Sequence, residues 1–165
     1  MDILSNQKWR WLLFFLFLCF SVEIIGGWLT QTSVNSWYPT LLKPTWNPPN
    51  WIFGPVWTLL YGLMAFSLWL IWLKQQEGGV QKSFTLAYFL FGFQLLLNCL
   101  WSGLFFWMQN PAIALIDILL LWIVLLLTIV EFKKHSVFAA LLLVPYFLWI
   151  TYAVSLNSAI WVLNS

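Results

Sequence analysis

The chain has 165 residues, of which 62% are hydrophobic and only 7% are charged, and its formal net charge is +2. A soluble domain carries about a quarter charged residues, so this sequence has too little polar surface to cover a globule in water. The modest net charge, without a basic cluster, also argues against nucleic acid as a partner. The composition therefore predicts an integral membrane protein.

Five apolar stretches are long enough to cross a bilayer, which takes about 20 residues in a helix. They run over about 11–29, 51–73, 84–107, 112–132 and 137–162. Backbone groups in lipid must be paired internally, and these stretches are too long for barrel strands, so we expect helices. The predicted fold is an all-α membrane protein, a five-transmembrane-helix bundle that forms one domain over residues 1–165.

The first stretch begins like a secretory signal peptide, because Lys8 and Arg10 precede an apolar run. A signal peptide ends at a cleavage site of small residues. Here Glu23 and bulky residues such as Trp28 follow instead. We therefore expect a retained first helix.

A segment rich in proline and tryptophan joins the first stretch to the second. Residues 37–61 read WYPTLLKPTWNPPNWIFGPVWTLLY. Proline fixes φ and removes a backbone donor, so this segment is predicted to be a stiff, non-helical loop that ends at a helix start. We expect the loop to form a rigid lid over a cavity, with six lid residues: Trp37, Tyr38, Lys43, Pro44, Pro48 and Pro49.

Three features interrupt the later apolar stretches. Residues 74–82 are polar and include a glycine pair, which predicts a flexible turn. Residues 108–112 predict a tight turn, with Pro111 near the start of the fourth helix. Pro145 lies inside the fifth stretch and should kink that helix, because it removes one backbone hydrogen bond.

Basic residues gather on one side of the predicted bundle. Lys43 alone belongs to the opposite side, whereas the other six share the side of the N-terminus: Lys8, Arg10, Lys74, Lys82, Lys133 and Lys134. By the positive-inside rule, the N-terminus and the two basic loops face the cytoplasm. The proline-rich loop and the C-terminus then lie on the trans side.

Several polar side chains fall at bilayer depth, where they usually face the interior of a bundle. Because successive helices alternate in direction, four of them lie in the trans half, beneath the proline-rich loop: Glu23, Asn98, Asp117 and Asn157. Trp57 and Trp101 lie at a similar depth, and Trp149 lies near the middle. Aromatic walls with a few fixed polar groups predict a ligand cavity.

Structural roles remain open for the same residues. The deep tryptophans could serve helix packing or lipid contact, and Asn98 and Asn157 could bond between helices. Asp117 could accept a hydrogen bond from a tryptophan or tyrosine of a neighbouring helix. Trp51 and other tryptophans near helix ends fit an interfacial aromatic belt. The lone histidine, His135, lies in a cytoplasmic hairpin, so no metal site and no axial haem ligand is predicted.

The sequence closely resembles the translocator protein family (TspO/MBR, formerly the peripheral-type benzodiazepine receptor). The longest shared motif runs from Trp37 to Tyr61 and reads W-Y-x-x-L-x-K-P-x-W-x-P-P-x-W-x-x-G-P-V-W-x-x-L-Y. Further motifs are G-x-Q-L-x-L-N-x-x-W from Gly92, A-L-I-D-I-L-L from Ala114 and P-Y-x-x-W-x-x-x-A-x-x-L-N from Pro145. Their order and spacing follow the family from about residue 20 to the end.

The resemblance implies a five-helix bundle, often dimeric, with a pocket on the side of the first loop. Family members bind porphyrins, notably protoporphyrin IX, and benzodiazepine-type drugs, and some bind sterols. The positions that carry over as pocket residues are Trp57, Asn98, Trp149 and Ala153. Some bacterial members degrade protoporphyrin in light, and the resemblance makes Trp57 and Trp149 the candidates for that chemistry.

Three departures from the family pattern bear on function. No basic residue follows Lys134, so the animal sterol-recognition motif is absent. Ile113 stands where the animal drug pocket has a tryptophan. The third stretch lacks the small-residue pair that forms a dimer seam in some bacterial members, so a homodimer would use another face.

We therefore expect a membrane protein that binds a tetrapyrrole such as protoporphyrin IX and acts in porphyrin handling or stress regulation. Its partners are porphyrin, membrane lipid and a second copy, and no cofactor is required. Alternatives are a light-dependent porphyrin-degrading enzyme and a carrier of porphyrins, sterols or other lipophilic molecules. The expected ligand-binding residues are Trp46, Trp57, Asn98, Trp101, Asp117, Trp149, Ala153 and Asn157.

Overall fold

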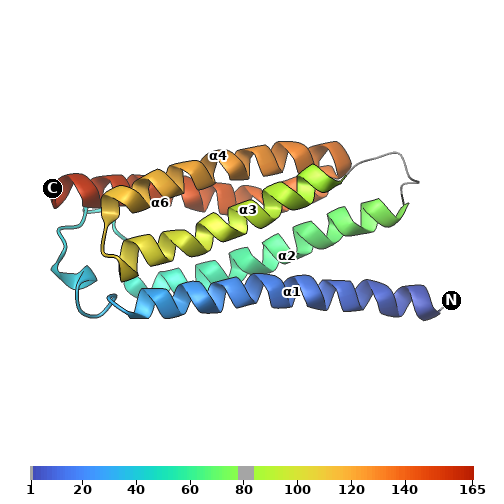
Figure 1. The fold of residues 1–165 in the computed structure, drawn as a ribbon, viewed down its shortest axis with the longest axis horizontal. Helices are drawn as coiled ribbons and strands as arrows, with labels where there is room; N and C mark the ends of the chain where they lie inside the picture. The colour runs from blue at the N-terminus through green and yellow to red at the C-terminus, as the bar shows by residue number, and fades with distance from the viewer. Residues whose placement is uncertain (1, 78–83) are drawn as a thin grey trace.

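A computed structural model describes residues 2–77 and 84–165 as an elongated bundle of antiparallel helices (Figure 1). The helices are α1 (Asp2–Gln31), α2 (Phe53–Glu77), α3 (Thr85–Ser102), α4 (Pro111–His135), α5 (Val137–Leu142) and α6 (Val144–Leu163). Within these ranges five helical stretches are long and apolar enough to span a membrane, α5 and α6 together forming the fifth. The predicted all-α five-span fold is confirmed. A turn was expected at 74–82, but residues 74–77 continue α2, and the remainder, Lys82 included, lies outside the described residues.

The fifth span bends at the proline. Leu143 separates α5 from α6, and its N–H bonds to the carbonyl oxygen of Ala140 at 3.1 Å, which is a tighter turn than an α-helix makes. Pro145 lies in the first turn of α6. A backbone N–H at that position has no acceptor within the helix, so the missing N–H of proline costs no helical hydrogen bond. The predicted kink is therefore confirmed.

The third span ends in a π-helical turn, Gly103–Trp107, which the sequence did not predict. Its wider ring is closed by the N–H of Met108, which donates to the carbonyl oxygen of Gly103 at 2.8 Å. The chain then reverses at Gln109, whose φ of 51° is left-handed. Asn110 caps α4 by accepting from the N–H of Ile113 at 3.1 Å, so the tight turn predicted at 108–112 is confirmed.

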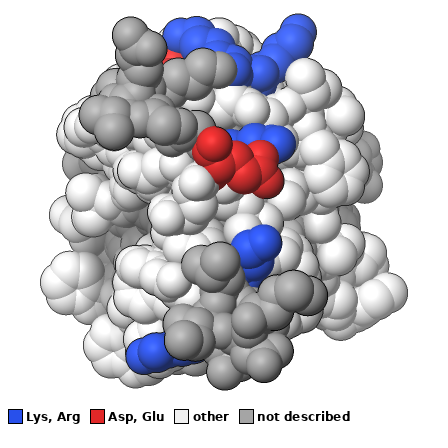
Figure 2. All heavy atoms as spheres, turned by 90° about the vertical axis from the view of Figure 1, so that its right-hand side faces the viewer, with Lys and Arg blue, Asp and Glu red and all other residues white. Residues whose placement is uncertain are grey.

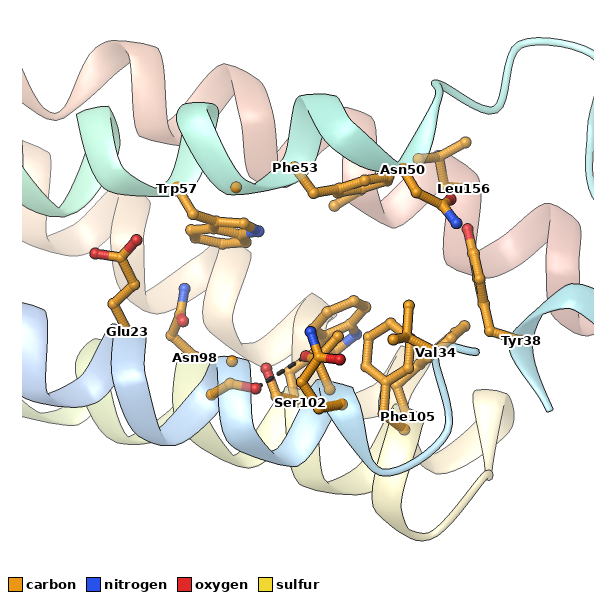
Figure 3. A pocket seen from close by; sticks show the side chains of 18 of the residues that line it. Glu23, Val34, Tyr38, Asn50, Phe53, Trp57, Asn98, Ser102, Phe105 and Leu156 are labelled. Carbon is orange, nitrogen blue, oxygen red and sulfur yellow. Dashed lines mark hydrogen bonds between the residues drawn. The ribbon is translucent and has the colours of Figure 1, made fainter. Parts of the chain in front are cut away.

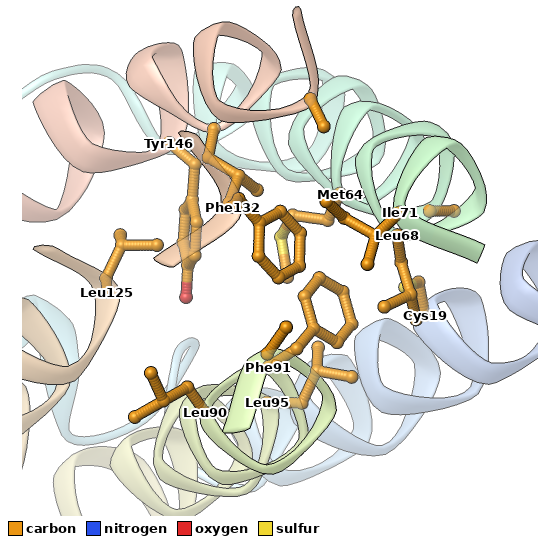
Figure 4. Close-up of a cluster of buried hydrophobic side chains, with 14 of the residues drawn as sticks. Cys19, Met64, Leu68, Ile71, Leu90, Phe91, Leu95, Leu125, Phe132 and Tyr146 are labelled. Carbon is orange, nitrogen blue, oxygen red and sulfur yellow. The ribbon is translucent and has the colours of Figure 1, made fainter. Parts of the chain in front are cut away.

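The helices form a ring in which α1 packs against α2 and α3, while α4 packs against α3, α5 and α6. The half nearer the N-terminus is filled with apolar side chains (Figure 4). There the rings of Phe91 on α3 and Phe132 on α4 stack with centroids 5.9 Å apart. Met64 and Ile71 of α2 are fully buried beside them. In lipid such contacts hold helices together by close packing, because the tails outside are equally apolar.

Lysine and arginine side chains gather at the end of the bundle that carries the N-terminus (Figure 2). The exposed basic residues at this end are Lys8, Arg10, Lys74, Lys133 and Lys134. Lys43 lies in the loop at the other end, between α1 and α2. The prediction that the N-terminus faces the cytoplasm depends on this separation of the basic residues between the two ends of the bundle.

The segment after α1 is fastened to the π-helical turn by one buried hydrogen bond. The Ser33 hydroxyl donates to the carbonyl oxygen of Phe106 at 2.6 Å. Five residues beyond Phe106 stands Pro111, which has no N–H to offer that carbonyl. Ser33 is 1% exposed, so water does not replace the bond.

We predict that Ser33→Ala lowers the free energy of unfolding by about 1–3 kcal/mol, because it leaves a buried carbonyl unpaired. Thermal unfolding in detergent would measure the change. Ser36→Ala is the matched control, since Ser36 is exposed in the same segment. Equal melting temperatures for the two variants would contradict the prediction.

Candidate functional site

A cavity of about 410 Å³ lies in the half of the bundle nearest the proline-rich loop (Figure 3). Its walls come from α1, α2, α3 with the π-helical turn, and α6, and Tyr38 of the loop closes one end. Trp57 and Phe53 of α2 lie across the cavity from Asn98 and Phe105. Its volume falls in the range of about 300–1,000 Å³ that is typical of ligand pockets.

Glycines open the cavity on the side of α1 and α2. Gly26 faces α3, where an added Cβ would meet Ser102 Oγ at 3.3 Å, so its lack of a side chain lets the two helices approach. Gly27 and Gly54 also line the cavity, but an added Cβ at either position would meet nothing within 4 Å. Both glycines are exposed, so the cavity reaches the surface between α1 and α2.

Two tryptophans form an aromatic corner of the cavity. The rings of Trp57 and Trp149 meet edge to face, with centroids 6.4 Å apart and planes at 86°. Phe53 packs on Trp149, and Tyr61 packs on Trp57. Among the described residues neither indole N–H has a hydrogen-bond acceptor, so both remain able to donate to a ligand. The corner offers apolar faces and two N–H groups to a flat molecule.

Asn98 ties three helices together beneath this corner. Its Oδ1 accepts a hydrogen bond from the Tyr61 hydroxyl of α2, and its Nδ2 donates to the Tyr146 hydroxyl of α6 at 2.7 Å. Tyr146 is completely buried and Tyr61 is 3% exposed. The interhelical role that was left open for Asn98 is therefore present, and its amide also faces the cavity.

Asn157 makes a second bridge, nearer the loop. It accepts from the indole N–H of Trp101 at 3.0 Å and donates to the carbonyl oxygen of Pro111 at 2.8 Å. The bonds join α6 to α3 and to the start of α4. They also hold the Trp101 ring against Phe105, with centroids 5.2 Å apart. The main role of Asn157 is therefore to fix the position of Trp101 in the cavity wall.

The proline-rich loop is fastened to α6 at two places. Asn164 exchanges two hydrogen bonds of 2.9 Å with the backbone of Leu42, and the Tyr152 hydroxyl donates to the carbonyl oxygen of Trp46 at 2.6 Å. Within the loop, the Tyr38 hydroxyl donates to Asn47 at 3.0 Å. Burial raises the pKa of the Tyr38 phenol, which keeps it a donor at neutral pH.

The cavity brings together most of the residues proposed from the sequence, and leaves out others. Seven of them line it: Tyr38, Trp57, Asn98, Trp101, Trp149, Ala153 and Asn157. Seven do not: Trp37, Lys43, Pro44, Trp46, Pro48, Pro49 and Asp117. Lys43 lies just behind the wall, with Nζ 4.6 Å from the centre of the Tyr38 ring and donating to the Leu41 carbonyl at 3.1 Å. Trp46 is 55% exposed and contributes its carbonyl oxygen.

Asp117 lies on α4, which supplies none of the described lining residues. It is 8% exposed, and its Oδ2 finds no hydrogen-bond partner in the described part of the chain. The expectation of a tryptophan or tyrosine donor for Asp117 is not met there. Trp101 and Trp122 donate instead to Asn157 and Thr151.

The sequence reasoning placed Glu23 of α1 at the depth of the cavity but did not count it among the binding residues, and it missed the other residues that this helix contributes. Glu23, Gly27 and Thr30 all line the cavity from this helix. The glycine pair at 26–27, followed by a small residue one turn later, was the available signal. Trp51 was assigned to an interfacial belt, and it also lines the cavity while remaining 73% exposed. No three His, Cys, Asp or Glu side chains gather into a metal site over residues 2–77 and 84–165.

Comparison with known proteins shows the family to which this chain belongs. The model of the TspO/MBR family matches residues 15–162, which is nearly the whole chain. The chain belongs to the TspO/MBR family. The matched range includes all four cavity-forming helices, from the middle of α1 to the end of α6.

Relatives in bacteria and animals span most of the chain. It is 42% identical over 147 residues to the tryptophan-rich protein TspO of Chlorobaculum tepidum, covering 89% of this chain and 91% of that protein. It is 36% identical over 152 residues to the tryptophan-rich sensory protein of Cereibacter sphaeroides, covering 92% and 90%. It is 37% identical over 125 residues to the human translocator protein, covering 76% and 73%.

We predict that Asn98→Leu lowers the free energy of unfolding by about 2–4 kcal/mol, since two buried tyrosine hydroxyls lose their partner. Thermal unfolding in detergent would show the loss. Cys99→Ala is the matched control, because the neighbouring Cys99 is half-buried and free. A melting temperature for Asn98→Leu equal to that of the control would show that the network is energetically unimportant.

Proposed function

We propose that this membrane protein binds a tetrapyrrole of the protoporphyrin IX type in the cavity beneath the proline-rich loop. The observation that carries the proposal is the corner formed by Trp57 and Trp149, which both line an aromatic cavity and whose indole N–H groups have no acceptor among the described residues. A flat conjugated ring gains most from such aromatic faces. The TspO/MBR membership supports the same ligand class, which the sequence motifs imply.

The chemistry of the cavity favours a large apolar ring over a hydrophilic solute. Aromatic side chains dominate its lining, among them Phe53, Tyr61, Trp101 and Phe105. The amides of Asn98 and Asn157 are already engaged with protein partners, so they fix the walls rather than select a ligand by several new bonds. Ligand orientation then depends on stacking and on the few free donors.

The loop end of the cavity suits the acidic edge of a porphyrin. Lys43 is held behind Tyr38 by its contact with that ring and with the Leu41 carbonyl. A rotation of its flexible side chain would bring the ammonium toward carboxylates at the mouth. We therefore propose that propionate groups lie at the loop, on the trans side of the membrane, with the N-terminus in the cytoplasm.

In the cell, a bound porphyrin would be stored, handed on or sensed, which makes porphyrin handling or stress regulation the proposed role. Carriage of porphyrins, sterols or other lipophilic molecules is the alternative that the opening between α1 and α2 favours. Flux of protoporphyrin across liposomes containing the protein would separate carriage from binding.

We predict that Gly27→Leu weakens protoporphyrin IX binding by at least about tenfold, because the new side chain would occupy the cavity. Quenching of tryptophan fluorescence by porphyrin would measure the affinity. Gly92→Leu is the matched control, since Gly92 is exposed on α3, has open space around it and does not line the cavity. Equal affinity in both variants would place the porphyrin elsewhere.

A second candidate function is the light-dependent oxidation of the bound porphyrin by molecular oxygen. The contact between Trp57 and Trp149 favours it, because two adjacent indoles can be oxidised beside an excited ring. The resemblance to the family makes the same two tryptophans the candidates for this reaction. Simple binding leaves the porphyrin unchanged in light, whereas the enzyme would convert it.

We predict that Trp57→Phe and Trp149→Phe each lower the rate of porphyrin loss under illumination by about tenfold or more, while affinity falls only a few-fold because phenylalanine keeps an aromatic face. Absorbance during illumination of the purified protein would follow both substrate and product. Trp122→Phe is the control, because Trp122 lies outside the cavity lining. If wild-type protein forms no new absorbing product, the protein binds without degrading.

A further inference from the structure

Glu23 occupies the end of the cavity opposite to Tyr38, beside Trp57 and Asn98 (Figure 3). It is eight residues from the end of α1, which corresponds to a depth of about 12 Å along the helix. Of the described residues that line the cavity, it is the one with a formally charged side chain. An ionisable side chain at such depth is energetically costly unless it pairs with another group of the protein or with a ligand.

One carboxylate oxygen of Glu23 has a fixed partner. The Thr58 hydroxyl of α2 donates to Oε1 at 2.6 Å, which joins α1 to α2 at the deep end of the cavity. Oε2 makes no hydrogen bond to another described residue. The nearest cationic side chain at the loop end, Lys43, is held behind Tyr38 and outside the lining. The carboxylate thus faces the cavity without a protein counter-charge in the described lining.

We propose that Glu23 makes the deep end of the cavity a receptor for a cationic nitrogen, so that the site accepts flat aromatic ligands carrying a protonated amine. The aromatic corner holds the ring by its faces, and the free carboxylate oxygen pairs with the ammonium group. An anionic group at the same end would meet like charge at the half-buried Glu23 carboxylate. The inference concerns the same cavity as the proposed porphyrin site but does not require that porphyrin bind there.

The roles of Glu23 as a receptor and as a helix clamp are separable by substitution. Glu23→Gln keeps an oxygen that accepts from Thr58 and removes only the charge. Thr58→Val removes the interhelical hydrogen bond and keeps the charge. The pair therefore distinguishes a ligand-binding carboxylate from a structural one.

The experiment compares two probes of similar flat shape, cationic 9-aminoacridine and anionic anthracene-9-carboxylate, in nanodiscs of zwitterionic phosphatidylcholine. Binding is followed by quenching of tryptophan fluorescence. We expect wild-type protein to favour the cation, and Glu23→Gln to weaken its binding by about tenfold or more, as loss of a charge-assisted hydrogen bond implies. Binding of anthracene-9-carboxylate should stay the same or tighten, and Thr58→Val should retain the preference for the cation.

Two results would overturn the inference. One is equal affinity of wild-type protein and Glu23→Gln for 9-aminoacridine. The other is a loss of binding in Thr58→Val as large as in Glu23→Gln, accompanied by a lower melting temperature in both, which would make Glu23 a clamp. Protoporphyrin IX titrated into the same samples reports on the porphyrin site separately, because its binding should survive Glu23→Gln.

Discussion

The absence of water in the bilayer is the constraint on which this structure depends, because a polar group at depth is costly unless it finds a partner within the protein. Asn98 and Asn157 meet it in the same way. Each uses its carbonyl and amide groups to connect different helices, Asn98 through Tyr61 and Tyr146, and Asn157 through Trp101 and the Pro111 carbonyl. The same bonds join the helices that form the cavity walls and fix their positions relative to one another.

Side-chain hydrogen bonds also attach the proline-rich loop to the helix bundle. Its prolines have no backbone N–H, so the attachment of the loop to the helices depends on particular side chains. Tyr152 of α6 and Asn164, which follows α6, bond to the loop backbone, and Ser33, in the segment before the loop, bonds to the π-helical turn. The lid is thus joined to two different walls of the cavity. Proline fixes part of the loop backbone and these hydrogen bonds attach it to the helices, and only the prolines were visible as a sequence pattern.

Hydropathy and depth predicted the five spans and the position of the cavity beneath the loop, and the chemistry of proline predicted the kink at Pro145. They could not predict how each helix is rotated about its own axis, and therefore which of its side chains face the cavity. A helix that is apolar on every side gives no periodic signal to separate its interior face from its lipid face. Asp117 lies at the expected depth on α4 but away from the described lining, whereas Glu23 lies at a similar depth on α1 and faces the cavity. The π-helical turn was also invisible, because backbone register near Gly103 depends on contacts made by other elements.

That π-helical turn has a consequence for how the chain tolerates change in length. It holds one residue more per turn than the α-helix before it. Loss of a single residue within the turn would let it tighten to an α-helical turn, and the side chains beyond the deletion would keep their direction, because the wider turn already absorbs one extra residue. Phe105 and Phe106 both lie within this turn and pack on Tyr38, so deletion of either would remove one ring from the aromatic cluster at the end of the cavity while α4 kept its register.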